Sequence, residues 1–217
     1  MTQTLSNPEI AAAGLADWRK LAQALHARYA VTDPVAGAEF VAATTRLAGA
    51  ADHLEARLTR LAVDLTLCTA EDGRWVTKAD MDLAAQITAI ARDRGHAAQP
   101  DAVTQLEVAL DTWDEKTVGP FWSALLTGSP DNTIYDSVFD PSGRVPAVWF
   151  QTTDRHETPR QRWHFDLWLA PEVAAERIAA AVAAGGTVLY DADAPAFVVL
   201  ADPDGNRVCV CTAAGRD

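Results

Sequence analysis

Cysteine is scarce in this sequence, with three residues among 217, and no CxxC pair occurs. Cys68 is far in the chain from Cys209 and Cys211, which are two residues apart. Because residues at that spacing share one face of a strand, Cys209 and Cys211 suggest either a metal or redox pair or two reduced, buried side chains. A disulfide framework is excluded, and we expect a cytoplasmic protein.

Basic residues are also in deficit. Lys and Arg total 18 against 30 Asp and Glu, which gives a formal net charge of -12. Binding to nucleic acid or to an anionic membrane depends on neutralising phosphate charge, so we expect neither as a partner. No window approaches the roughly eighteen apolar residues of a membrane span, and the N-terminus lacks the basic-then-apolar pattern of a signal peptide.

Length and composition are those of a globular chain with two domains. Hydrophobic residues make up 49% and charged residues 22% of the 217 residues, and domains of about 100 residues are common. Residues 96–101, His-Ala-Ala-Gln-Pro-Asp, form a short polar stretch at which the pattern changes. We therefore predict one domain over 1–97 and a second over 98–217.

The pattern predicts an α+β fold, with an N-terminal α-β-α domain followed by paired βαβββ modules. In the first domain, helical spacing of apolar residues predicts a helix over 9–28. Two further helices are expected at 34–48 and 77–94, and a strand is expected at 61–69. In the second domain, an imperfect duplication predicts helices at 114–127 and 171–184, and strands at 104–111, 133–139, 146–152, 162–169, 187–191, 196–201 and 207–212.

A series of local motifs runs through the second domain in a fixed order. They are Ala-Leu-Asp-Thr at 109–112, Pro-Phe-Trp-Ser at 120–123, Val-Trp-Phe-Gln at 148–151, Arg-Trp-His-Phe-Asp-Leu at 162–167 and Asp-Pro-Asp-Gly-Asn at 202–206. Together they resemble the glyoxalase-like branch of the vicinal oxygen chelate superfamily, which also includes bleomycin-resistance proteins and dioxygenases. The resemblance covers nearly all of residues 103–213.

This resemblance implies a site built from equivalent strands of the two modules. Metal-dependent members take His, Gln or Glu ligands there, and the metal polarises a vicinal-oxygen substrate. Glu107 and His164 match metal-ligand positions, while Cys209 stands where a final-strand carboxylate is expected. The cofactor stays open at this point: the ligand is expected to bind either with a divalent metal in this domain or without one. The alternative for His164 is a strand histidine that is hydrogen-bonded within the wall of the cavity.

Aromatic residues gather in the same domain and suggest a planar organic ligand. His164 and Asp166 share one face of their strand, opposite to Trp163. Ordinary core packing is the alternative for most of the aromatic side chains. The residues that we predict to bind the ligand are Trp122, Trp149, Gln151 and Asp166.

The first domain resembles the pterin-4a-carbinolamine dehydratases, also called 4a-hydroxytetrahydrobiopterin dehydratases, over about residues 15–95. The supporting motifs are Gly-Ala-Glu-Phe-Val at 37–41, Asp-His-Leu-Glu at 52–55, Leu-Thr-Leu-Cys-Thr at 65–69 and Thr-Lys-Ala-Asp-Met-Asp at 77–82. These lyases move protons with a His-His-Pro turn, a third His after the central strand, and an Asp beyond it.

Only part of that catalytic set is present. His53 matches one member of the His pair, the second or the first according to whether the strand or the preceding helix is aligned, and Asp80 matches the Asp. Ala70 stands at the third His, so little or no dehydratase activity is expected. The alternative for His53 is a histidine at the end of a helix without a catalytic role. The alternative for Asp80 is a surface carboxylate in the first turn of its helix, where negative charge is favoured.

Three functions follow from these residues. We expect a glyoxalase-like protein that binds a small organic ligand in the C-terminal cleft, beside a dehydratase-like domain without activity. The first alternative is an enzyme, either a dehydratase with a modified site or a metal-dependent glyoxalase-like enzyme. The second alternative is a structural module for self-association, and a homo-oligomer is expected because dehydratase-like domains self-associate.

Overall fold

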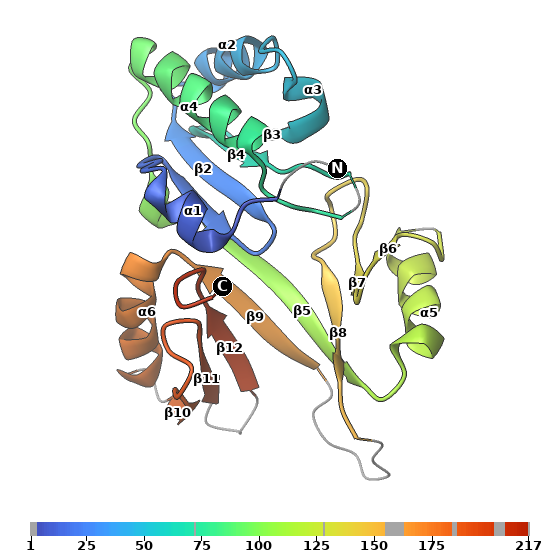
Figure 1. Cartoon of the computed structure of the whole chain (residues 1–217). Coiled ribbons are helices and arrows are strands. Elements are labelled where there is room, and N and C mark those ends of the chain that lie inside the picture. Colours follow the sequence, from blue (N-terminus) through green and yellow to red (C-terminus); the bar gives the residue numbers. More distant parts are fainter. Residues whose placement is uncertain are drawn as a thin grey trace. The chain divides into compact units, whose positions relative to one another are not determined.

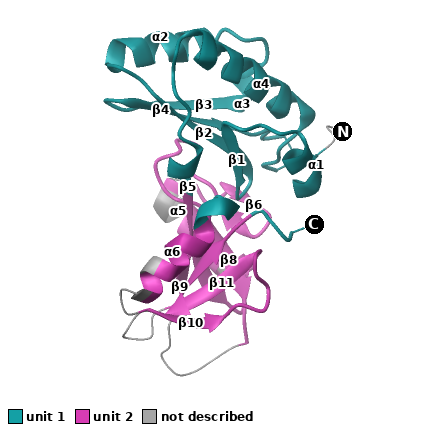
Figure 2. Cartoon of the chain, turned by 90° about the vertical axis from the view of Figure 1, so that its left-hand side faces the viewer, with its two compact units in different colours: residues 1–104, 170–173, 213–217 teal, residues 105–169, 174–212 magenta. Residues whose placement is uncertain are grey.

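The computed structural model describes residues 4–71, 73–127, 129–154, 163–183, 186–201 and 207–216. The chain divides into two compact units, coloured separately in Figure 2. Unit 1 comprises Met1–Thr104, Ala170–Val173 and Ala213–Asp217, and unit 2 comprises Gln105–Leu169 and Ala174–Thr212.

Unit 1 contains an antiparallel sheet of four strands in the order β1-β2-β4-β3. The strands are β1 (Trp18–Leu21), β2 (Ala24–Ala30), β3 (Leu54–Leu58) and β4 (Ala62–Leu67). The helices are α1 (Asn7–Ala12), α2 (Pro34–Thr44), α3 (Ala50–His53), α4 (Lys78–Asp93) and the short 3-10 helix η1 (Pro100–Ala102). Helices α2 and α4 lie side by side over one face of the sheet (Figure 1).

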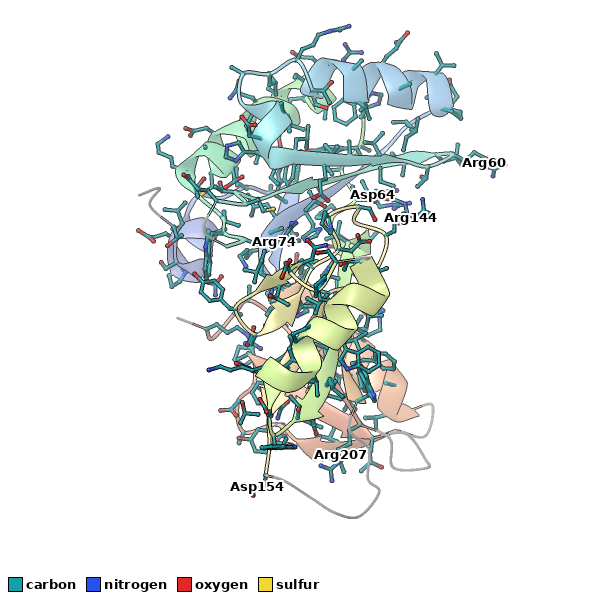
Figure 3. All side chains as sticks on the ribbon, turned by 90° about the vertical axis from the view of Figure 1, so that its right-hand side faces the viewer. Arg60, Asp64, Arg74, Arg144, Asp154 and Arg207 are labelled. Carbon is teal, nitrogen blue, oxygen red and sulfur yellow. The ribbon has the colours of Figure 1, made fainter. Side chains whose placement is uncertain are left out.

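The core of unit 1 forms between that face and the helices. Tyr29 from β2, Phe40 from α2 and Ile87 from α4 are fully buried within it, and the rings of Tyr29 and Phe40 meet edge to face at 5.3 Å. The opposite face of the sheet carries polar side chains. There Arg28 donates to the carboxylate of Asp64 at 2.6 Å, and Asp64 is labelled in Figure 3.

The predicted helix over 9–28 is wrong, because most of that range forms α1, β1 and β2. Gly14 has a φ of +64°, and Ala22 in the tight turn between β1 and β2 has a φ of 46°; neither angle occurs in a right-handed helix. Beyond that turn, Leu25, Ala27 and Tyr29 are buried in alternation. Alternate burial is the signature of a strand with one covered face, and it takes precedence over the helical spacing.

Unit 2 contains a sheet of eight strands in the order β10-β11-β12-β9-β5-β8-β7-β6. The first module is β5 (Thr104–Thr112), α5 (Glu115–Thr127), β6 (Thr133–Ile134), β7 (Ser137–Val138) and β8 (Val148–Thr152). The second is β9 (Trp163–Leu169), α6 (Pro171–Ala183), β10 (Thr187–Tyr190), β11 (Phe197–Ala201) and β12 (Arg207–Cys211). The predicted α+β fold with paired βαβββ modules is confirmed.

Two further details differ from the sequence prediction. The single strand expected at 133–139 is a short hairpin, in which Tyr135 has a φ of 53° between β6 and β7. The expected linker is partly ordered along β2: Ala30 donates to the carbonyl of Ala97 at 2.8 Å, and Gln99 donates to the carbonyl of Arg28 at 2.7 Å. Residues 97–99 therefore extend the hydrogen bonding of unit 1.

None of the helices within the described residues is both long enough and apolar enough to cross a lipid bilayer.

Two glycines of unit 1 provide a test of its backbone. A Cβ at Gly73 would lie 2.3 Å from the indole of Trp75, and the residue has a φ of 135°, whereas a Cβ at Gly37 meets the mobile end of the exposed Leu58. We expect Gly73→Ala to lower the free energy of unfolding by about 1–3 kcal/mol. We expect Gly37→Ala to change it by less than about 1 kcal/mol, since Ala also favours the helix. Urea denaturation compares the two, and equal losses would contradict this expectation.

Candidate functional sites

The two faces of the sheet in unit 2 differ sharply in character. On one face, β5, β7 and β8 pack apolar side chains against α5, in a cluster formed by Leu110, Val138, Val148 and Phe150. Trp122 from α5 and Trp163 from β9 pack on that cluster, with ring centroids 4.8 Å apart. Trp122, which we predicted to bind a ligand, therefore lies on the helix side of the sheet.

The other face gathers polar side chains from four adjacent strands. They are Asp111 from β5, Trp149 from β8, His164 and Asp166 from β9, and Cys209 from β12. Strand pairing explains the cluster, because Cys209 is directly opposite Asp166 in the parallel pair β12–β9. Residues two apart on β9 share a face, which brings His164 and Asp166 together. We call these five residues the polar cluster.

His164 lies at the centre of the polar cluster. Its Nδ1 is 3.5 Å from Oδ1 of Asp111, and its Nε2 is 3.4 Å from Oδ1 of Asp166. The side chains of His164, Asp111 and Asp166 are 14%, 20% and 9% exposed. The imidazole is thus held between two carboxylates in a largely buried setting, where electrostatic interactions are screened less than at the surface.

Two tryptophans donate to carboxylates of this domain. Trp149 donates from Nε1 to Oδ2 of Asp166 at 2.6 Å, and its ring meets the ring of His164 edge to face at 5.7 Å. Trp168 donates from Nε1 to Oε2 of Glu107 at 2.8 Å. Of the predicted site residues, Trp149, Asp166 and His164 are therefore brought together.

Glu107 and His164 have different neighbours in these contacts. The buried Glu107 accepts from Trp168, whereas His164 lies beside Asp111 and Asp166. Gln151 is exposed at the end of β8, directly opposite Asp111. Arg162, the first residue of the motif at 162–167, lies outside the described residues.

Sequence reasoning assigned no role to Asp111. The sequence did indicate that Asp111 lies on the same face as a predicted site residue, because Glu107 and Asp111 are four residues apart on one strand. The carboxylate of Asp111 now presents a buried Oδ1 that makes no hydrogen bond among the described residues. Nδ1 of His164 lies 3.5 Å from this oxygen, and a buried carboxylate oxygen with no hydrogen bond is well placed to bind a cation.

The polar cluster has ligands suited to a metal ion. The ligand atoms of His164, Asp166 and Cys209 all lie within 4.8 Å of one another. Donor atoms of a tetrahedral zinc ion lie about 3–4 Å apart, given bonds of about 2.0–2.3 Å, so small side-chain rotations bring this set into range. A nitrogen, oxygen and sulfur set favours zinc and similar transition metals over magnesium or calcium.

A second group of polar residues lies in unit 1, around Asp80. Asp80 is fully buried at the start of α4, and its Oδ1 is 2.9 Å from Nδ1 of His53. Its Oδ2 accepts from the backbone amide of Thr77 at 2.7 Å and from the hydroxyls of Thr77 and Thr69 at 2.8 Å each. The predicted pair His53 and Asp80 is therefore brought together by one network of hydrogen bonds.

This network combines a structural and a chemical role. Thr77 and Asp80 form the capping box of α4, which satisfies backbone donors at the start of the helix. Because Asp80 engages Nδ1 of His53, the opposite nitrogen of that half-buried ring is left for proton exchange. Nearby, burial raises the pKa of the Cys68 thiol, which keeps this side chain protonated.

Comparison with known protein families assigns both halves of the chain. Residues 107–211 match the glyoxalase-like domain, and residues 3–90 match pterin 4 alpha carbinolamine dehydratase. No curated protein matches the chain. The molecule is thus a two-domain α+β protein. Its chain joins an N-terminal pterin-4a-carbinolamine dehydratase domain to a C-terminal glyoxalase-like domain, as the sequence motifs predicted.

Proposed function

We propose that the glyoxalase-like domain binds a small organic ligand at the polar cluster, together with a divalent metal ion held by His164, Asp166 and Cys209. The observation that carries the proposal is the convergence of these three side chains within 4.8 Å. Four neighbouring strands contribute to the cluster, so its residues are positioned by the sheet itself.

The surrounding residues support a binding role. Trp149 holds Asp166 through its indole N–H, which fixes one carboxylate oxygen and leaves the other toward His164. Asp111 lies on the far side of the imidazole and can orient it through Nδ1. When bound, a metal ion would act as a Lewis acid toward an oxygen of the ligand. The aromatic rings beside it would contact a planar ligand.

Thermal unfolding with added Zn²⁺, Ni²⁺ or Mn²⁺ tests the metal. We expect the melting temperature to rise with Zn²⁺ and Ni²⁺, because an ion that binds only the native state stabilises it by about 2.7 kcal/mol at one hundred times its dissociation constant. His164→Ala and Asp166→Asn should abolish the rise. Cys209→Ser should weaken it for Zn²⁺, since a hydroxyl is a poorer zinc ligand than a thiolate.

Cys211→Ser is the matched control, because Cys211 lies on the same strand but outside the ligand group. The organic ligand is tested separately, by the tryptophan fluorescence of the metal-loaded protein with a panel of aromatic compounds. If neither the metals nor the panel changes melting or fluorescence, the proposal fails. The self-association module is then the better function, and sedimentation of the full chain tests it.

The dehydratase domain supports a second candidate function, a lyase reaction on a carbinolamine pterin. The observation in its favour is the contact of His53 with the buried Asp80, which provides one oriented imidazole for proton transfer. The presence of Ala70, where the dehydratases have their third histidine, argues against this function. We propose that this domain has little dehydratase activity.

A further inference from the structure

Unit 1 contains a cavity of about 440 Å³ that is separate from the network of His53 and Asp80. It lies between α2, the end of β2 and the segment that follows α4, and these elements are adjacent in Figure 1. None of the residues that line it belongs to the network of Asp80. We call it the α2–α4 cavity.

The main chain around the cavity is already hydrogen-bonded within the protein. Ala30 donates to Ala97 at 2.8 Å, Val31 donates to Leu61 at 3.0 Å, and His96 donates to Ala91 at 2.9 Å. These backbone donors are therefore not available to a ligand. The polar side chains of the lining are Thr32, whose hydroxyl donates to Asp33, together with Glu39, Arg94 and His96.

Glu39 and Arg94 line this one cavity with opposite charges. Within the described part of the chain, neither side chain forms a hydrogen bond or an ion pair, with the other or with any third residue. An acid and a base that line one cavity without pairing can each accept an opposite charge from a ligand. A guanidinium suits a carboxylate especially well, because it binds both oxygens in one plane.

His96 adds a neutral polar group to the wall. Its ring packs against Phe40 with centroids 4.9 Å apart. Burial, and to a lesser extent the charge of Arg94, lowers the pKa of His96 below its ordinary value. The imidazole is therefore uncharged at pH 7, and the side chains of the cavity carry one negative and one positive charge.

We propose that the α2–α4 cavity binds a small zwitterion with one carboxylate and one ammonium group, such as an aliphatic α-amino acid. Arg94 holds the carboxylate and Glu39 holds the ammonium. The small apolar side chains of Ala30, Val31 and Ala36 contact the aliphatic part. A ligand with a single charge would leave either Glu39 or Arg94 without a partner, which explains the preference for a zwitterion.

The test is a titration of the full chain with L-leucine, followed by NMR at the backbone amide of Gly95 and the ring protons of His96. Two compounds each carry half of the charge pattern: L-leucinamide keeps only the ammonium, and 4-methylpentanoate keeps only the carboxylate. We expect saturable shifts with leucine, and binding at least about ten-fold weaker for either compound, since each loses one charge-assisted hydrogen bond.

Arg94→Gln and Glu39→Gln should each weaken the binding of leucine by about ten-fold or more. Both residues are exposed and the replacements are close in size, so the fold is retained, as the spectra of the variants will show. Arg92→Gln, in the last turn of α4, is the matched control and should bind as the unaltered chain does. The proposal is overturned if leucine gives no saturable shift, if either half-charged compound binds equally well, or if Arg92→Gln and Arg94→Gln behave alike.

Discussion

Replacing Asp80 by alanine is expected to lower the free energy of unfolding of the dehydratase domain by about 3–5 kcal/mol, because several buried donors lose their acceptor at about 1–3 kcal/mol each. Asp80 is fully buried and accepts hydrogen bonds from Thr69 and from Thr77, while it also contacts His53. Without its carboxylate, the amide of Thr77 and two hydroxyls lose their acceptor inside the protein. A loss of this size is a large share of the stability of one domain.

Urea denaturation of the full chain, followed by hydrogen exchange of the α4 peptides, measures this effect. Asp82→Ala is the matched control on the same helix, because Asp82 is exposed and its pair with Lys78 contributes only about 0.3–0.5 kcal/mol. Asp80→Asn keeps the shape of the side chain but turns one acceptor into a donor, so it should fall between the two. If Asp80→Ala and Asp82→Ala destabilise equally, Asp80 does not hold this end of α4 together.

The sequence predicted the architecture of the glyoxalase-like domain well because its strands alternate clearly. His164 and Asp166 were expected on one face and Trp163 on the other, and the structure separates them in this way. Trp122 was harder to place. The sequence of α5 does not show which side of the sheet this helix covers, and in the structure Trp122 packs against Trp163.

The start of the dehydratase domain was predicted less well, for a physical reason. Leu15, Trp18, Leu21 and Leu25 match helical spacing, but a tight turn at Ala22 breaks the chain direction between them. A left-handed alanine has no strong signature in a sequence, since glycine or asparagine usually occupies such positions. Alternation over residues 25–30 was the better guide, and the two patterns overlap at Leu25.

The candidate sites were predictable to different degrees. His53 and Asp80 were each selected from the resemblance to a family, but their contact was not predicted, because the two residues are 27 positions apart and no local pattern joins them. The place of Asp111 beside His164 depends on how β5 and β9 pair in the sheet. Register between distant strands is set by packing as a whole, so a single sequence did not reveal this contact.

Introducing a histidine at Ala70 is expected to raise the rate of pterin dehydration by about 10²–10⁴-fold, the usual contribution of one general acid or base. The resemblance to the dehydratases places their third histidine at this position. Ala70 is exposed and directly follows Thr69, whose hydroxyl is 3.1 Å from Nδ1 of His53. A larger side chain can therefore be placed here without entering the core, next to a histidine that Asp80 already orients.

The dehydration of a 4a-carbinolamine pterin, followed by absorbance, measures the rates of the unaltered chain, Ala70→His and Ala70→Gln. Glutamine is the control for size and polarity, because it cannot exchange protons near neutral pH. If the new imidazole acts together with the old one, adding His53→Ala to Ala70→His should remove most of the gain. Equal rates for Ala70→His and Ala70→Gln would show that the missing histidine does not account for low activity. The contact of His53 with Asp80 would then serve the stability of the domain rather than proton transfer.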